Sequence, residues 1–324
     1  MTSSSYPNGF TNGVTIRGLP IQIAQPGKVF FVNNSSILAP GGIPGSDFGP
    51  GSYLQPFKTV EGALSNGKLT NFAGRGDILM VMPNHAETIS NATLMALNCA
   101  GVTVVGLGDG ISRPTFTFNT ATTATITINA ANMSFINCIF VANFASIAAA
   151  FTVNAVNFYL GDCQFQDSTS ILNFVNIISA SATTNAASGL AAYNNKFYGL
   201  GAASNTCFIN SLGTHDKWTF NNNYVTHTAV TGGGFMQTAS GKNITNLIVN
   251  GNTGNFTGAT SLTTGVFMIT GGTANTGVLS NNFCKSLDDT SPILVTASSG
   301  LTFYNNYYQA NADKSGFLLP AVDS

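Results

Sequence analysis

Charged side chains are scarce in this chain. They make up 7 % of its 324 residues, with 11 Lys and Arg against 12 Asp and Glu, whereas about 25 % is usual in a soluble domain. The formal net charge is −1, and the basic residues do not cluster along the sequence. Because nucleic-acid binding depends on concentrated positive charge, we expect no nucleic-acid partner.

Cysteines and long apolar runs are also few. The five cysteines show no CxxC or Cys/His spacing of the kind that binds zinc, and their number is odd. We therefore expect buried free thiols, as in a protein assembled in a reducing cytosol. No segment approaches the roughly 18 apolar residues of a membrane span, and the start has no basic or apolar part typical of a signal peptide. Membrane association and export are not expected.

Many of the uncharged polar residues are Asn, and they recur at regular intervals along the chain. Seven segments each alternate like a strand, end in a pair of Asn-type residues, and continue into an aromatic residue, except at Thr253. The segments are Met133–Phe140, Phe158–Phe165, Leu190–Phe197, Trp218–Tyr224, Leu247–Thr253, Val278–Phe283 and Leu301–Tyr307. The second members of the pairs are separated by 25, 32, 28, 29, 30 and 24 residues. This spacing is that of a solenoid coil built from short strands and turns.

The Asn pair has a physical role at a corner between two strands. A tight corner forces a residue toward positive φ, which Asn tolerates, and stacked coils bring equivalent Asn amides within hydrogen-bonding distance, ~4.8 Å apart. The following aromatic residue is expected to point inward and stack. The predicted corner ladder consists of Asn137, Asp162, Asn195, Asn223, Asn252, Asn282 and Asn306.

One amphipathic helix is predicted near the front, at Gln55–Leu64. Phe57, Val60 and Leu64 share one helical face, and Gly67 follows the end. The first coil of a solenoid has an open edge that invites aggregation, so a capping element must cover it. We expect these three side chains to lie over that coil.

These repeats resemble those of right-handed parallel β-helix proteins, the pectate-lyase-like superfamily. Segments in this chain that match the front of such proteins are Val29–Val32, Ser46–Gly51, Pro56–Phe57 and Gly76–Asp77. The resemblance implies an all-β, single-stranded right-handed parallel β-helix at 77–310, with a leading strand, loop and capping helix at 29–76. The tail at 311–324 would cap the last coil.

Residues 1–28 lie outside the coils and are expected to form an extended arm that binds a partner. Val14, Ile16, Ile21 and Ile23 alternate as a bound strand would; the alternative is a terminus without fixed structure. The segment from Tyr6 onward resembles the start of β-helix proteins encoded beside capsid genes in tailed bacteriophages. That resemblance implies a head decoration or fibre protein, assembled in the host cytoplasm as a homotrimer and attached to the major capsid protein or another virion protein.

A search for catalytic groups gives no convergent set. Glycoside hydrolysis needs two carboxylates about 5–9.5 Å apart, yet the coils next to Asp162 and Asp167 offer no second acid. The sequence therefore argues against catalysis, and no metal or cofactor is expected. The best remaining cluster, His215–Lys217, reads as a solvated loop beside Trp218. His85 and Glu87 read as surface residues, and His227 reads as a turn residue.

Two other functions stay open. Tailspike depolymerases that digest host surface polysaccharide have the same fold, so the chain could act on, or only bind, a host glycan. Binding would use aromatic side chains on a coil face, for which the candidates are Tyr159, Tyr193, Tyr198 and Tyr308. These rings are equally compatible with contacts between subunits.

Overall fold

The structure is a computed structural model in which almost every regular element is a strand. It describes residues 14–16, 19–21, 27–34, 45–65, 74–91, 95–201, 207–228, 234–256, 267–268, 274–286, 300–309 and 315–317. Within these ranges there is one α-helix, α1 (Val60–Ser65), and one short 3-10 helix, η2 (Gly110–Ser112). Neither of these described helices has the length or the apolar character that crossing a membrane requires.

Most strands belong to three long sheets that run the length of the molecule. Sheet I contains β3 (Val29–Val32), β4 (Ile78–Val81), β7 (Thr103–Gly106), β10 (Ser134–Ile136), β13 (Tyr159–Gly161), β16 (Ala191–Tyr193), β20 (Thr219–Asn221), β24 (Leu247–Asn250), β27 (Thr276–Ser280) and β29 (Gly300–Tyr304). Sheet II contains β5 (Ala86–Ile89), β8 (Thr115–Phe118), β11 (Ile139–Ala142), β14 (Gln164–Asp167), β17 (Lys196–Gly199), β21 (Tyr224–His227), β25 (Thr253–Phe256), β28 (Phe283–Ser286), β30 (Tyr307–Gln309) and β31 (Ser315–Phe317). Sheet III contains β6 (Ala96–Leu97), β9 (Ile126–Ile128), β12 (Phe151–Val153), β15 (Asn176–Ala180), β18 (Cys207–Ser211), β22 (Met236–Thr238) and β26 (Phe267–Met268). A further small sheet pairs β19 (His215–Asp216) with β23 (Ile244–Thr245).

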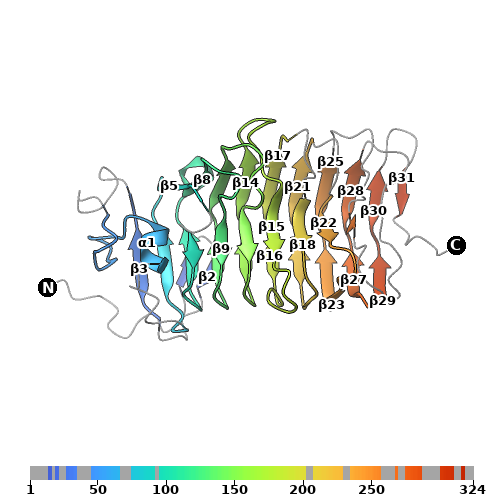
Figure 1. The fold of residues 1–324 in the computed structure, drawn as a ribbon, viewed down its shortest axis with the longest axis horizontal. Helices are drawn as coiled ribbons and strands as arrows, with labels where there is room; N and C mark the ends of the chain where they lie inside the picture. The colour runs from blue at the N-terminus through green and yellow to red at the C-terminus, as the bar shows by residue number, and fades with distance from the viewer. Residues whose placement is uncertain are drawn as a thin grey trace.

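Within the three sheets, each strand except β31 pairs in parallel with the equivalent strand of the next coil. In sheet I, for example, Phe135 lies opposite Leu160, Leu160 opposite Ala192, and Ala192 opposite Phe220. The coils follow one another along a single axis, from the N-terminal end to the C-terminal end (Figure 1). The chain is therefore a parallel β-solenoid, and the seven predicted repeat segments are the strands of sheets I and II on either side of one corner.

Stacked phenylalanines fill much of the interior. Phe116, Phe140, Phe165 and Phe197 lie in register on β8, β11, β14 and β17 and are fully buried. The ring centroids of Phe116 and Phe140 are 5.4 Å apart and those of Phe140 and Phe165 are 4.9 Å apart, both stacked. This offset stacking adds to the stability gained from burying the rings. The prediction of an inward aromatic column is confirmed for these coils.

The same prediction is wrong for later coils. Tyr224, Phe283 and Tyr307 follow the Asn pair directly and lie one position earlier on their strands than Phe197 does. Because side chains alternate between the two faces of a strand, these three point outward, and Phe283 and Tyr307 are 42 % and 44 % exposed. A shift of one residue moves an aromatic ring from the core to the surface.

At the front, α1 lies beside the first coil of sheet III. The helix begins at Val60, so Phe57 precedes it and forms a parallel bridge with Val32 of β3 instead. Phe57, Val60 and Leu64 are all at most 1 % exposed and belong to the common core. The helix thus starts five residues later than predicted, and the three apolar residues are buried as expected.

The two terminal segments are described only in part. In the predicted arm, β1 (Val14–Ile16) pairs antiparallel with β2 (Leu19–Ile21), which is a two-stranded unit in place of one extended strand. Ile23 and the rest of 1–28, apart from residues 27 and 28, lie outside the described residues. In the tail, β31 pairs antiparallel with β30, and residues 318–324 lie outside the described residues.

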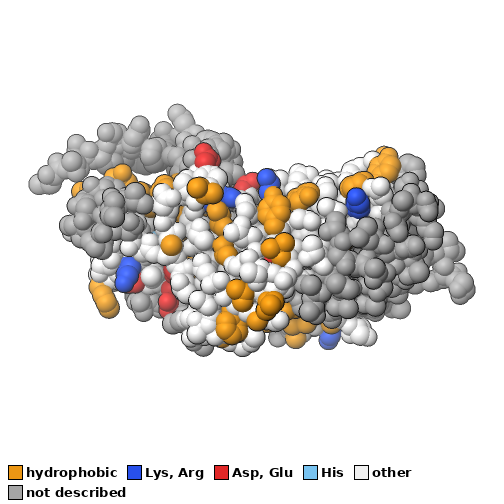
Figure 2. Space-filling model, turned by 90° about the horizontal axis from the view of Figure 1, so that it is seen from above, with side chains coloured by type: hydrophobic (Ala, Val, Ile, Leu, Met, Phe, Trp, Pro, Cys, Tyr) orange, Lys and Arg blue, Asp and Glu red, His pale blue; other side chains and the backbone are white. Residues whose placement is uncertain are grey.

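The described surface is mostly uncharged. Seen from above the view of Figure 1, white polar surface and backbone predominate, with scattered orange apolar side chains and few coloured charges (Figure 2). The low charge content of the sequence is thus visible on this face. Such a surface gives little long-range electrostatic steering.

Candidate functional site

The corner between sheets I and II divides the Asn pair into two distinct positions. The first position has positive φ in every repeat, which L-residues rarely adopt and Asn, Asp and Gly tolerate best. Its occupants are Asn137, Asp162, Asn194, Asn222, Gly251, Asn281 and Asn305, with φ between 51° and 66°. The second position turns its side chain into the molecule.

The second position forms a continuous ladder of buried amides, which we call the asparagine ladder. The backbone N–H and the Nδ2 of each residue both donate to Oδ1 of the next, at 2.8–3.0 Å. The Nδ2 also donates to a carbonyl of the preceding coil, as from Asn223 to Ala192. The members are Asn195, Asn223, Asn252, Asn282 and Asn306, all at most 2 % exposed.

Two residues of the predicted ladder do not belong to it. Asn137 and Asp162 occupy the first, left-handed position, and the Nδ2 of Asn137 donates to the backbone carbonyls of Gly106 and Gly108. In their coils the second position holds Cys138 and Cys163, and the backbone N–H of Cys163 donates to Oδ1 of Asn195. The ladder therefore continues into two buried cysteines. The prediction failed because it assigned the ladder to either member of the pair. The first member provides the left-handed turn, and only the second points inward into the ladder.

His85 and Glu87 are buried at the front of the solenoid, so their prediction as surface residues is wrong. They are 1 % and 8 % exposed. The backbone N–H of Asn34 donates to Nδ1 of His85 at 3.2 Å, so the neutral ring carries its proton on Nε2, which lies 3.0 Å from Oε2 of Glu87. Glu87 in turn accepts from the backbone N–H groups of Val60 and Glu61. The pair anchors the start of α1 to the first coil.

Asp47, near α1, is also committed to backbone contacts. Oδ1 of Asp47 accepts from the N–H groups of Lys58 and Thr59, and the Thr59 hydroxyl accepts from the N–H of Gly62. Burial, followed by the charges of Glu87 and Asp47, raises the pKa of Glu61. The carboxylates of Asp47 and Glu87 and the hydroxyl of Thr59 satisfy N–H groups of the kind that a helix start leaves free.

A buried Asp77 lies on the opposite side of the front. It is 1 % exposed, and Arg75 donates to both of its carboxylate oxygens at 2.7 and 2.5 Å. Oδ1 also accepts from the backbone N–H of Lys28 at 2.7 Å. This bidentate ion pair ties the segment before β3 to the start of β4 and leaves the carboxylate without a free face for chemistry.

Asp167 is the most perturbed carboxyl group in the described part of the chain. It is 6 % exposed and accepts hydrogen bonds from the backbone N–H groups of Phe174, Leu200 and Gly201, at 2.8–3.2 Å. Burial raises its pKa to about 6 in spite of those three bonds, which act in the opposite direction. Asp167 holds together the turns of two successive coils.

The cluster at His215 is not the solvated loop that the sequence predicted. His215 is fully buried in β19, stacks on Trp218 with centroids 5.2 Å apart, and its Nε2 lies 2.9 Å from the carbonyl of Ser181. Burial lowers its pKa. Asp216 faces outward, and its pKa is lowered by hydrogen bonds, first from the Thr245 hydroxyl and then from the Asn246 amide. Both residues are occupied in packing one coil on another.

His227 is likewise a core residue and not the turn residue predicted. It ends β21, is fully buried, and its ring centroid lies 4.6 Å from that of Phe256 on the next coil. The sequence gives no signal for this burial, except that His227 stands two residues after Val225 and therefore on the same face of the strand.

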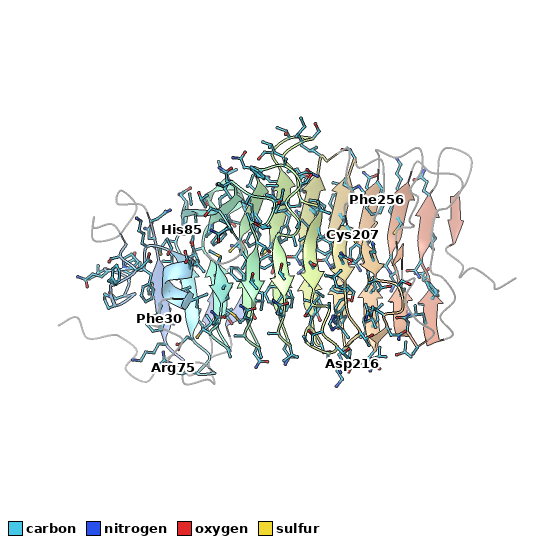
Figure 3. All side chains as sticks on the ribbon, in the orientation of Figure 1. Phe30, Arg75, His85, Cys207, Asp216 and Phe256 are labelled. Atoms are coloured by element: carbon cyan, nitrogen blue, oxygen red, sulfur yellow. The ribbon has the colours of Figure 1, made fainter. Side chains whose placement is uncertain are left out.

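These polar groups do not converge. His85 and Arg75 lie on opposite sides of the front, and Asp216 lies farther along the solenoid (Figure 3). Among the described residues, no three of His, Cys, Asp or Glu are grouped so that they could hold a metal ion. The five described cysteines are free and buried, and burial raises the pKa of Cys163 and Cys207 to about 12.

Comparisons with known proteins add little to this geometry. No protein-family profile matches the sequence, and no curated protein matches it. A solved structure described as "Rhamnogalacturonan lyase" is similar to the chain, with 12 % sequence identity, a TM-score of 0.40 and coverage of 90 % of both chains. The expectation that the chain is not an enzyme is corrected: a similar structure is named as a lyase, and this similarity shows neither that the chain is an enzyme nor that it is not.

Proposed function

We propose that this chain is a structural rod of a tailed-bacteriophage particle, either a head decoration protein or a capsid fibre, attached through residues 1–28. The observation that carries the proposal is the unbroken stack of coils joined by the asparagine ladder. Backbone pairing joins the described coils, stacked rings are added in earlier coils and buried amides in later ones, a construction suited to a stiff and durable rod. The link to phage particles comes from the resemblance of the N-terminal segment.

Further parts of the proposal concern assembly. We propose that the solenoid winds to the right, that α1 caps its first coil, and that three copies associate in the particle. The burial of Phe57, Val60 and Leu64 supports the cap. Without a capping element, the apolar side chains of the first coil would be exposed to water.

Particle composition tests the proposal directly. Mass spectrometry of particles purified from a culture that produces the protein should detect it at a fixed ratio to the major capsid protein. A chain that lacks residues 1–28 should be lost from the particles, whereas a matched chain that lacks residues 318–324 should stay attached. Absence of the full-length chain from washed particles would contradict the virion role.

A second candidate is a glycan-binding or glycan-cleaving tailspike, and one observation favours it. Tyr198 and Tyr224 lie on the outer face of sheet II with ring centroids 6.0 Å apart, and Tyr198 is 38 % exposed. Neighbouring rings on the outer face of an uncharged surface can stack on sugars. Incubation with host capsule or lipopolysaccharide distinguishes the candidates: released oligosaccharide, or binding that a Tyr198→Ala change abolishes, would favour the tailspike.

A further inference from the structure

The corner between sheets I and II carries exposed apolar side chains in its last three described coils. Those on the sheet I side are Ile248, Val278 and Tyr304, and those on the sheet II side are Phe283 and Tyr307; they are between 40 % and 67 % exposed. β24 and β29 flank β27, and β25 and β30 flank β28. Val278 and Phe283 are therefore exposed although the strands on both sides of each are in place. In Figure 1 these strands form the orange and red end of the rod.

The surface at this corner is free of charge. We call the outward-facing side chains of 248–253, 278–283 and 302–307 the corner surface, and none of the residues in these three ranges is charged. Lys285 stands two positions after Phe283 on β28 and thus farther from the corner. Burying the corner surface therefore removes apolar area from water without the cost of desolvating an ion.

The corner surface has the shape of a convex edge. In each of its three coils one residue with φ between 51° and 66° turns the chain, at Gly251, Asn281 and Asn305, and the next residue points inward as part of the asparagine ladder. The exposed apolar side chains lie on the two outer sides of that turn. Pockets for small molecules are concave, so a convex apolar edge fits a protein surface instead.

Sheet III provides the contrast within the same molecule. Its outward residues Thr152, Ser179, Asn210 and Gln237 lie in register and are all polar. Among the strands of sheet III whose side chains are described, none carries an exposed large apolar residue. This face is therefore suited to water, whereas the corner surface is suited to contact.

We propose that copies of this chain pack side by side through the corner surface, with parallel rods and level coils, so that the sheet I side of one copy contacts the sheet II side of the next. The side-chain rows of this surface repeat every ~4.8 Å, and a partner that interdigitates with them over several coils needs the same repeat. A second copy of the chain has that repeat. Because the corner surface holds no charge, it also contains nothing that repels an identical surface.

The number of copies rests on the proposed function, which has three. A contact between unlike sides closes into a ring when the rotation from copy to copy allows it, and three convex edges can meet on one axis. In such a ring Val278 of one copy lies level with Phe283 of the next, because β27 and β28 belong to the same coil.

Light scattering during size-exclusion chromatography of the full-length chain tests the proposal. The mass should be three times the 33.6 kDa of one chain. Val278→Lys and Phe283→Glu each place a charge on one side of the contact, and each should raise the concentration at which the copies separate at least tenfold. Thr152→Lys, on the outward face of sheet III, is the matched control and should associate like the unchanged chain. Ile248→Lys, one coil earlier on sheet I, replaces Val278→Lys if circular dichroism shows that the latter does not fold.

A double variant tests the contact between unlike sides. With Val278→Lys and Phe283→Glu in one chain, the introduced ammonium of one copy faces the introduced carboxylate of the next, so association should recover and become sensitive to salt. A monomer at about 100 μM chain, well above a micromolar dissociation constant, would overturn the proposal. So would a dimer, single variants that associate like the unchanged chain, or a double variant that stays dissociated.

The particle experiment described above is a separate readout. A chain that is monomeric in solution but present in washed particles would overturn the contact and leave the virion role standing. A trimer that both single variants disrupt, but that is absent from washed particles, would support the contact and contradict the virion role.

Discussion

Truncation of one member of the asparagine ladder should destabilise the solenoid strongly. The Asn223 side chain makes four hydrogen bonds: Oδ1 accepts from the backbone N–H and Nδ2 of Asn195, and Nδ2 donates to Ala192 and to Asn252. In an Asn223→Ala variant, the two donors of Asn195 and the carbonyl of Ala192 lose partners in a site that is 1 % exposed. Each buried unpaired group costs about 1–3 kcal/mol, so with three such groups we expect a loss of at least about 3 kcal/mol.

The neighbouring residue provides a matched control. Asn222 is exposed and occupies the left-handed position, with φ 56°, so an Asn222→Gly variant keeps the backbone geometry without touching the ladder. Its free energy of unfolding should change by less than about 1 kcal/mol. Both variants are compared by urea unfolding followed by circular dichroism, with the midpoint and slope fitted together. If Asn223→Ala costs no more than Asn222→Gly, the ladder does not hold the coils together.

Three other predictions concern the core. Asp167 has a pKa of about 6 in the folded chain against 3.8 unfolded, so it adds about 3 kcal/mol to the free energy of unfolding below pH 4, and this is lost as pH rises through 6. The pH dependence should vanish in an Asp167→Asn variant. If unfolding measurements show the same pH dependence in that variant, the assignment to Asp167 is refuted. A thiol reagent should label no cysteine in the native chain and all five in urea; fast native labelling of Cys163 would contradict its burial. Phe140→Ala should cost about 3–5 kcal/mol in urea unfolding through cavity formation; a loss below 1 kcal/mol would show a loosely packed column.

The coil stack could be predicted because its signal is repeated. A strand, a corner and an Asn pair recur at a spacing that only stacked coils explain, so errors at single residues do not disturb the result. The burial of Val60 and Leu64 followed from their helical spacing, whereas Phe57 precedes the helix and bridges Val32. The repeat pattern did not distinguish the outward Tyr224 from the inward Phe197. Tyr224 lies one position earlier on its strand than Phe197 does, and the pattern was not resolved to a single residue.

The polar core residues could not be predicted from local sequence. His85 is buried through a contact with Asn34, which is 51 residues away, and His215 through Ser181, which is 34 residues away. Such partners come together only when the coils stack. Hydrogen bonds to these partners offset the desolvation free energy that otherwise keeps polar side chains at the surface. The virion role, its partners and the binding role of residues 1–28 stay predictions.

The register of the coils is tested most directly by engineered disulfides on the outer face of sheet II. Gln166 lies opposite Tyr198, and Tyr198 lies opposite Thr226. Adjacent strands are ~4.8 Å apart, within the span of a disulfide, whereas two steps, about 9.6 Å, exceed it. A chain with Gln166→Cys and Tyr198→Cys should form an intramolecular disulfide on mild oxidation, and one with Gln166→Cys and Thr226→Cys should not. Cross-linking of the second pair without the first would contradict the parallel, in-register stack.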